Sequence, residues 1–299
     1  MQVGESMPTT TLHRKSTAAT RSVTPRRYAF DHGSVGPDRH WLDDDLLASH
    51  LVATLSGVIP PGERFVAESV RRQRDRLDGP LQHQVKGFLG QERLHQREHD
   101  RFNRALAGLG YPTAMIDRAS AVTFAVAARF PARLQLAVTA AIEHWTAVIA
   151  EHTFVDDQFA DWQTSEAARA FLAWHLVEEL EHRAVAFDVM QATGVGEPQR
   201  ILAMHVTVLL LLPSVVGGLV LSLLGDRDTW NPFRLARSLR RFGRTPIARG
   251  SFVRDLLAWN RPGFHPDQRN IDALLEHWNA ELFGPEGLVT TNNRTQCAS

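Results

Sequence analysis

The chain has 299 residues with 33 basic and 33 acidic side chains, so no net charge draws it toward nucleic acid. Its single cysteine, Cys297, excludes an internal disulfide framework and a cysteine-rich zinc site. Fourteen histidines, many of them beside glutamates, indicate instead a site for catalytic iron, manganese or zinc, since imidazole and carboxylate are the usual ligands of those metals.

The first segment, residues 1–30, is rich in Ser, Thr and Arg and lacks the apolar run of a signal peptide. We expect a disordered leader there and a cytoplasmic protein. From Asp43 onward, helical periodicity interrupted by Pro and Gly predicts an all-α fold. We expect one helical domain over residues 31–285 and a flexible tail over 286–299.

Breaks in the periodicity divide the predicted bundle core, about 43–191, into helices. Pro60-Pro61-Gly62 separates the first two of them, because proline is favoured at the first turn of a helix and not inside it. The predicted helices span 43–58, 63–77, 81–107, 116–128, 132–154 and 166–190.

The next stretch, residues 201–225, contains no charged side chain and is long enough to span a bilayer. Pro213 and the pair Gly217-Gly218 interrupt it, so we favour a buried or interfacial helical hairpin over about 200–225. Membrane insertion and the wall of an apolar substrate pocket are the alternatives. Further helices are expected over about 230–285: an Arg-rich solvated segment over 230–250 and a short amphipathic helix over 271–283.

Two Glu-x-x-His pairs suggest the chemistry, Glu92 with His95 and Glu179 with His182. Residues three apart lie on one face of a helix, so each pair can hold one ion. A chain of this length and composition contains about one or two such pairs by chance, so spacing alone does not decide between a metal site and ordinary surface residues.

The context of the pairs favours a metal site. Glu63 lies on the predicted helix before the first pair, and Glu143 lies on the helix between the two pairs. The order of single Glu, pair, single Glu and pair is the pattern of ferritin-like di-metal four-helix bundles. Four carboxylates would balance the charge of two divalent ions.

The helix predicted over 166–190 offers a third ligand. His175, Glu179 and His182 fall within about 60° of arc at 100° per residue. Glu178 is the alternative to Glu179, whereas Glu181 is expected to point into solvent. His99 lies on the His95 face, either beside the site or as an ordinary packed histidine, and Glu68 is the alternative to Glu63.

Four runs carry a resemblance to a known family: Pro61-Gly62-Glu63-Arg64-Phe65, Phe88-Leu-Gly-Gln-Glu92-Arg-Leu-His95, Ala141-Ile-Glu143-His144-Trp145-Thr146 and Trp174-His175-x-x-Glu178-Glu179-x-Glu181-His182-Arg183. Over about 43–191 they resemble the bacterial family of predicted metal-dependent hydrolases. The ligand order is also similar to that of p-aminobenzoate N-oxygenases, di-iron oxygenases with three His and four Glu ligands. Carried over by position, this resemblance implies the ligands Glu63, Glu92, His95, Glu143, His175, Glu179 and His182.

The function expected from this site is that of a non-haem di-iron monooxygenase with two iron ions as cofactor and O2 as co-substrate. Its substrate would be a small hydrophobic molecule, such as a terpenoid or an acyl compound, in a biosynthetic pathway. Electrons would come from an external ferredoxin or reductase, since the sequence lacks a nucleotide-binding glycine fingerprint. A metal-dependent hydrolase of an ester or phosphate is the first alternative, and a non-catalytic metal-binding bundle is the second. Membrane contact and a homodimer remain open.

Overall fold

The computed structural model describes residues 23–155, 159 and 162–289, and in this part of the chain the regular elements are helices without strands. The all-α prediction is therefore confirmed. Four helices carry the expected ligands: α1 (Leu46–Arg71), α2 (Gly79–Gly108), α4 (Ala132–Val155) and α5 (Glu166–His182).

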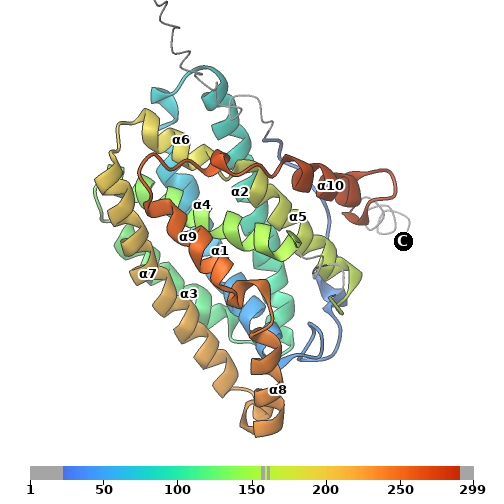
Figure 1. The fold of residues 1–299 in the computed structure, drawn as a ribbon. Helices are drawn as coiled ribbons and strands as arrows, with labels where there is room; N and C mark the ends of the chain where they lie inside the picture. Colours follow the sequence, from blue (N-terminus) through green and yellow to red (C-terminus); the bar gives the residue numbers. More distant parts are fainter. Residues whose placement is uncertain (1–22, 156–158, 160–161, 290–299) are drawn as a thin grey trace, which may run out of the picture.

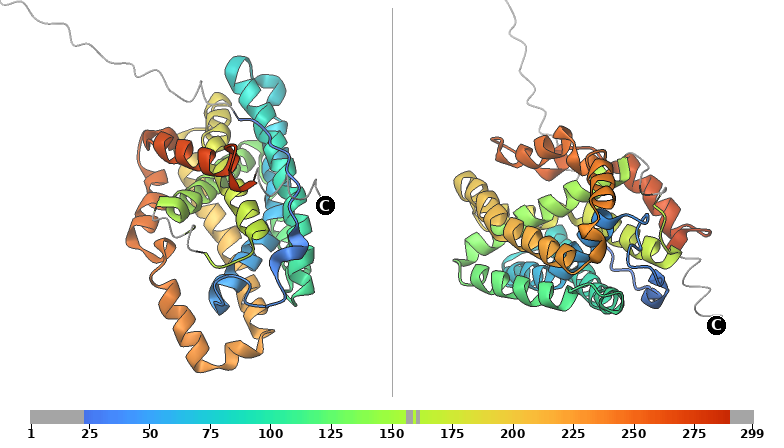
Figure 2. Two further views of the ribbon diagram at one scale, coloured as in Figure 1. Left: turned by 90° about the vertical axis from the view of Figure 1, so that its right-hand side faces the viewer. Right: turned by 90° about the horizontal axis from the view of Figure 1, so that it is seen from below.

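These four helices surround a common interior. α1 packs on α2 and α4, and α5 packs on the same two helices, so the four form a closed ring. α3 (Thr113–Ala127) and α7 (Glu197–Leu224) cover α1 on the outside, while α10 (Asp272–Phe283) lies against α5 (Figures 1 and 2). Residues far apart in sequence thus place their inward side chains in one buried space.

α1 is one continuous helix of 26 residues, so the predicted division at Pro60-Pro61-Gly62 is wrong. Pro60 has no N–H to donate to the carbonyl of Ser56, one turn earlier. The Asn103 side-chain amide on α2 donates to that carbonyl instead, at 2.9 Å. A neighbouring helix therefore replaces the hydrogen bond that proline removes, and this replacement cannot be read from the local sequence.

The segment 166–190 contains two helices instead of the one predicted, α5 and α6 (Val185–Ala192). The break at Arg183 and Ala184 has neither Gly nor Pro. The Arg183 guanidinium reaches the C-terminal segment, where it donates to Asp267 at 3.1 Å and to the Arg269 carbonyl at 2.8 Å. These distant contacts accompany a break for which the local sequence gives no signal.

The hairpin predicted over 200–225 is also wrong, because α7 runs unbroken through Pro213. Pro213 lies on the exposed side of α7, where water can hydrogen-bond the carbonyl that loses its donor. Gly218 lies on the packed side, where a Cβ would come within 3.0 Å of Thr54 and 3.4 Å of Ile116. This glycine permits close helix packing and does not form a turn.

The C-terminal segment is helical as expected, with α8 (Pro232–Phe242), α9 (Gly250–Leu257) and α10. α10 agrees closely with the amphipathic helix predicted over 271–283. The connection between α9 and α10 crosses the outside of α4 and α5 (Figure 1).

Residues 23–30, the last part of the predicted disordered leader, pack against the helices, so the predicted boundary at residue 30 is wrong. Val23 and Phe30 are buried, and the stretch between them lies along α2. Gly87 and Gly90 allow this close approach, since a Cβ at the first would overlap the Val23 carbonyl and one at the second would overlap the Pro25 ring. We call residues 23–30 the strap. The rest of the predicted leader lies outside the described residues. The tail predicted over 286–299 is wrong at its start, because Val289 is buried in the core, and residues 290–299 with Cys297 lie outside the described residues.

Candidate metal centre

The seven predicted ligands lie on four helices and are all buried in the space that these helices enclose. α1 contributes Glu63, α4 contributes Glu143, and the other five come from α2 and α5. The i, i+3 pair on α2 and the i, i+4, i+7 set on α5 face inward as the spacing predicts. No residue of the set has more than 7% of its surface exposed.

Three of these residues form a first half-site: Glu63, His95 and His175. Their closest ligand atoms all lie within 4.8 Å of one another. Glu63 Oε1 is 3.9 Å from His95 Nδ1 and 3.7 Å from His175 Nε2. One carboxylate and two imidazoles thus converge on a space about the size of one ion.

A second half-site contains Glu92, His95, Glu179 and His182, again with ligand atoms within 4.8 Å. His182 Nε2 is 3.4 Å from Glu92 Oε1. Glu179 Oε1 of this second half-site also lies close to the first, at 2.9 Å from His175 Nε2 and 3.6 Å from His95 Nδ1, and it is 3.8 Å from His182 Nε2. A carboxylate in this position can bridge two ions.

Six buried polar atoms at this centre have no hydrogen-bond partner among the described residues. They are both oxygens of Glu63, Glu92 Oε1, His95 Nδ1, Glu179 Oε2 and His182 Nε2. A buried acceptor that lacks a partner costs about 1–3 kcal/mol, and more if it is charged. All six atoms are potential metal ligands, so the donor set fits two cations.

The electrostatics agree with this assignment. Burial, with repulsion from neighbouring carboxylates, raises the pKa values of Glu63, Glu92 and Glu143 well above the usual value for a glutamate. Burial also lowers the pKa of His95 well below its usual range, with His175 adding to the effect. Burial would raise the pKa of Glu179 too, but the nearby His182 and His175 outweigh this effect and lower the pKa of Glu179 to about 2. Cations would offset the repulsion among these glutamates.

Two of the imidazoles are held on their far side by carboxylates. His95 Nε2 donates to Glu178 Oε2 at 3.0 Å, which leaves Nδ1 facing the centre. His182 Nδ1 donates to Glu143 Oε2 at 2.8 Å, which leaves Nε2 facing the centre. Carboxylates in this position fix the tautomer and orientation of metal-binding histidines. The structure therefore places Glu143, which the sequence analysis expects to be a direct ligand, behind His182 and outside both half-sites.

The third imidazole, His175, is held by a chain of hydrogen bonds that fixes its tautomer. Ser56 Oγ donates to Asn103 Oδ1 at 2.7 Å, so it must accept from His99 Nδ1 at 2.8 Å. His99 Nε2 then accepts from His175 Nδ1 at 2.7 Å. His175 Nε2 consequently faces the centre, 2.9 Å from Glu179 Oε1, and His99 is a positioning residue.

The structure distinguishes the expected glutamate ligands from the alternatives that the sequence left open. Glu68 is partly exposed and pairs with Arg71 and Arg72, so it does not compete with Glu63. Glu178 borders the centre only through His95. Glu181, expected in solvent, is buried, because Arg26 of the strap and Gln91 donate to its carboxylate.

Two histidines that follow Glu143 on α4, His144 and His152, contact the C-terminal segment. His144 is buried against Trp259 and Phe264, with Nε2 donating to the Asp255 carbonyl at 3.2 Å. His152 Nε2 contacts Asp255 Oδ2 at 3.0 Å. Their partners come from the C-terminal segment, more than 100 residues away in sequence.

Comparison with known proteins extends these observations. A family model described as "Predicted metal-dependent hydrolase" matches residues 24–270. The chain belongs to this family. Searches of curated proteins and of solved structures each found no match. The family match covers the strap, all four ligand-bearing helices, α7 and most of the C-terminal segment, well beyond the expected 43–191.

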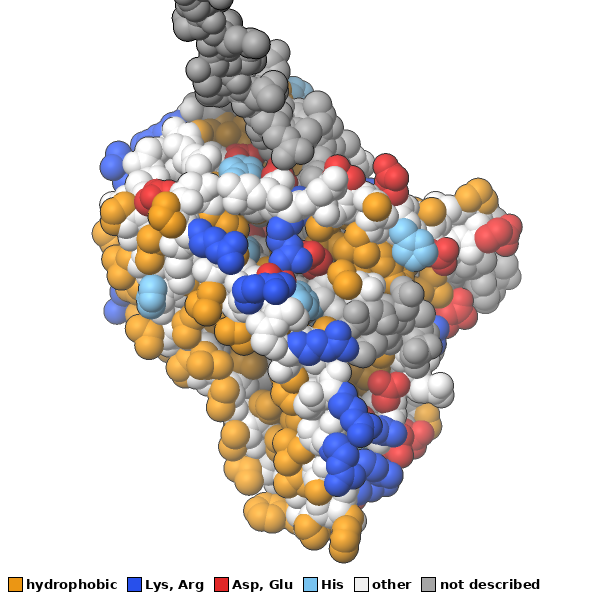
Figure 3. Space-filling view, in the orientation of Figure 1, with side chains coloured by type: hydrophobic (Ala, Val, Ile, Leu, Met, Phe, Trp, Pro, Cys, Tyr) orange, Lys and Arg blue, Asp and Glu red, His pale blue; other side chains and the backbone are white. Residues whose placement is uncertain are grey.

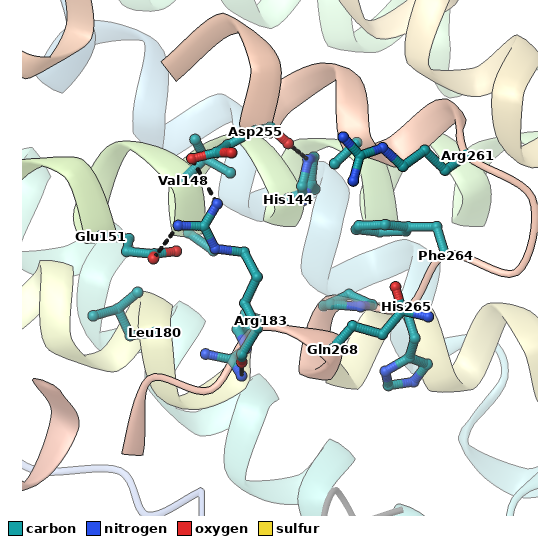
Figure 4. A pocket seen from close by; sticks show the side chains of 14 residues that line it. His144, Val148, Glu151, Leu180, Arg183, Asp255, Arg261, Phe264, His265 and Gln268 are labelled. Atoms are coloured by element: carbon teal, nitrogen blue, oxygen red, sulfur yellow. Dashed lines mark hydrogen bonds and ion pairs between the residues drawn. The ribbon is translucent and has the colours of Figure 1, made fainter. Parts of the chain in front are cut away.

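A cavity of about 220 Å³ lies beside the centre, on the outer side of α4 and α5 (Figure 4). Its lining includes His144, Leu180 and Arg183, each one residue after an expected ligand, but none of the seven expected ligands themselves. Arg269 crosses it to pair with Glu151 and Asp255. No α7 residue lines this cavity, so α7 is not its apolar wall.

Proposed function

We propose that this family member is a non-haem di-iron oxygenase that uses O2 to oxygenate a small organic molecule, with electrons from an external ferredoxin or reductase. The observation that supports this most directly is the pair of buried half-sites around Glu179 Oε1. Carboxylate-rich sites with imidazoles, built between the helices of a bundle, suit pairs of iron or manganese ions.

Bound ferrous ions would supply the electrons that reduce O2, which no ordinary side chain can do. The chain itself provides the ligand positions, the balancing negative charge and the exclusion of water. Phe88 packs edge-on against His182 and Trp174 edge-on against His95, with ring centroids 4.9 Å apart in each pair. Glu143, Glu178 and His99 hold the three imidazoles in place from behind.

The direct test is O2 uptake by protein loaded with ferrous iron under anaerobic conditions. We expect uptake in proportion to the bound iron, and we expect His175→Ala to lose most of it. His83→Ala, an exposed change on α2, should behave as the wild type and controls for free iron. Absence of O2 uptake by fully iron-loaded wild-type protein would contradict the proposal.

A metal-dependent hydrolase is the second candidate, favoured by the family description. A metal-bound water would then attack an ester or phosphate. Chromogenic nitrophenyl esters and phosphates, tested with zinc or manganese and without O2, examine this directly. Turnover that needs no O2 and takes its oxygen from labelled water would replace the oxygenase proposal.

A further inference from the structure

α7 exposes apolar side chains along its whole length. They are Leu202, Leu209, Leu212, Val216, Val220 and Leu224, and from Leu209 onward they recur every three or four residues. Leu209 is 74% exposed, and the row is about 33 Å long at 1.5 Å per residue. The adjacent α3 adds the exposed Met115, Val122 and Val126. Apolar patches of this extent usually mark a contact with a protein or a membrane.

The other side of α7 is fixed to the bundle at both ends. Near its start, Met204 Sδ accepts from Trp145 Nε1 at 3.1 Å. Near its end, Ser222 Oγ lies 2.6 Å from His50 Nδ1. By length and composition α7 could cross a membrane, but these contacts hold it lengthwise against α1, α3 and α4. Crossing a bilayer would bring the charged ends of those helices into hydrocarbon, whereas lying in the plane of its surface would not.

Beyond the end of α7 the apolar row continues into a tip flanked by arginines. Trp230 and Phe233 are 70% and 85% exposed. Arg237, Arg240 and Arg244 are also exposed, and no ion pair is found for them among the described residues. In Figure 3 hydrophobic side chains follow α7 to the lower end, where basic side chains gather over α8. The zero net charge of the whole chain does not remove this local excess.

We propose that the face formed by α7, the Trp230–Phe233 tip and α8 docks on an anionic membrane surface, with α7 in the plane of the interface. Tryptophan at the headgroup level, apolar side chains below it and arginines toward anionic lipids form the usual composition of such a contact. A two-fold contact that paired the two tips would bring the same arginines together, which disfavours that arrangement of a second copy. The inference does not depend on the proposed chemistry.

Flotation of the full chain with lipid vesicles tests it. We expect the protein to float with phosphatidylcholine vesicles that contain phosphatidylglycerol, less with phosphatidylcholine alone, and less at high salt. Arg237→Glu/Arg240→Glu should weaken binding by about tenfold or more, since each cation near an anionic surface contributes about fivefold. Trp230→Ser/Phe233→Ser should weaken it as well, and both variants alter exposed side chains that the fold does not need.

The matched control is Arg74→Glu/Arg76→Glu, which makes the same change of charge. These two arginines follow the C-terminal end of α1, whereas α8 contacts its N-terminal end. This variant should bind vesicles as the wild type does. Equal flotation of all three variants, or no binding of the wild type to anionic vesicles, would overturn the proposal. A stable dimer in sedimentation velocity that Trp230→Ser/Phe233→Ser dissolves, without vesicle binding, would assign the face to a second copy instead.

Discussion

Glu63 and Glu68 lie on the same helix, yet their surroundings differ completely. Glu63 is buried with both oxygens unpartnered, while Glu68 is bound by two arginines at the surface. We expect Glu63→Leu to lose one of two metal ions per chain and, without metal, to be more stable than the wild type by about 1–3 kcal/mol. Urea unfolding with and without chelator, together with metal analysis, measures both effects.

Glu68→Leu is the control for that experiment, and it should keep both ions and change stability by less than about 0.5 kcal/mol. A metal-free Glu63→Leu protein less stable than the wild type would mean that Glu63 is satisfied by the protein itself. The assignment of Glu63 as a ligand would then fail.

A substitution of His99 tests whether this residue positions His175. His99→Phe removes the acceptor for His175 Nδ1–H, and loss of such an outer contact typically weakens metal affinity by about 10–100-fold. Metal titration should show this loss at one of the two ions only. His83→Phe, on the same helix but exposed, should leave both affinities unchanged. Equal affinities in the wild type and His99→Phe would show that His175 needs no support.

For single residues, the sequence predicts which side chains share one face of a helix. Spacing places His175, Glu179 and His182 on one face of a helix, and the structure brings them together with the other half-site members. The surroundings of His144 and Glu181 could not be foreseen, because their partners come from the C-terminal segment and the strap. The place of Glu143 behind His182 depends on the orientation of one ring, which spacing does not determine.

At the scale of elements, the strap depends on two glycines of α2. Gly87→Ala places a methyl group where the Val23 carbonyl lies, so we expect it to displace the strap and free Arg26 from Glu181. Trypsin cleavage after Arg26 and Arg27 should become faster by at least about tenfold, as for a segment released from the core.

Gly108→Ala provides the comparison, since it is also on α2 and its added Cβ would meet nothing within 4 Å. Its cleavage rate should equal that of the wild type. A strap equally protected in both variants would mean that the close approach at Gly87 does not hold it.

The predicted helix ends agree with the structure where residues near the end of the helix itself start or stop it. α2 and α10 lie within a few residues of the predicted ranges. The errors at Pro60 and Pro213 have a common physical cause. In α1 the Asn103 amide replaces the lost hydrogen bond, and in α7 the carbonyl that loses its donor belongs to the exposed Leu209, so neither proline ends its helix.

At the scale of the whole molecule, Asp226, just after the end of α7, contacts His50 on α1 and His40 in the segment before α1. His50 Nε2 lies 2.9 Å and His40 Nε2 3.1 Å from its Oδ2. Burial alone would raise the pKa of Asp226, but hydrogen bonds from His50 and His40 outweigh it and lower that pKa to about 2. The folded protein then binds fewer protons here than the unfolded chain, whose Asp has a pKa of about 3.9, so this stabilisation is present above about pH 4 and is lost toward pH 2.

We therefore expect Asp226→Asn to be less stable than the wild type by about 2 kcal/mol at pH 7. The difference should hold down to about pH 4 and shrink below it. Urea unfolding of both proteins over this range measures it, with the exposed Asp38→Asn as the control. A difference that grows on acidification would contradict the assigned hydrogen bonds to Asp226.

The central claim is that side chains from four helices hold two metal ions side by side. X-ray absorption at the iron edge of the iron-loaded protein, with metal analysis of the same sample, tests it most directly. We predict two irons per chain, nitrogen and oxygen neighbours only, and an iron–iron distance of about 3.5–4 Å. A single iron per chain, or two without a short iron–iron distance, would contradict the account.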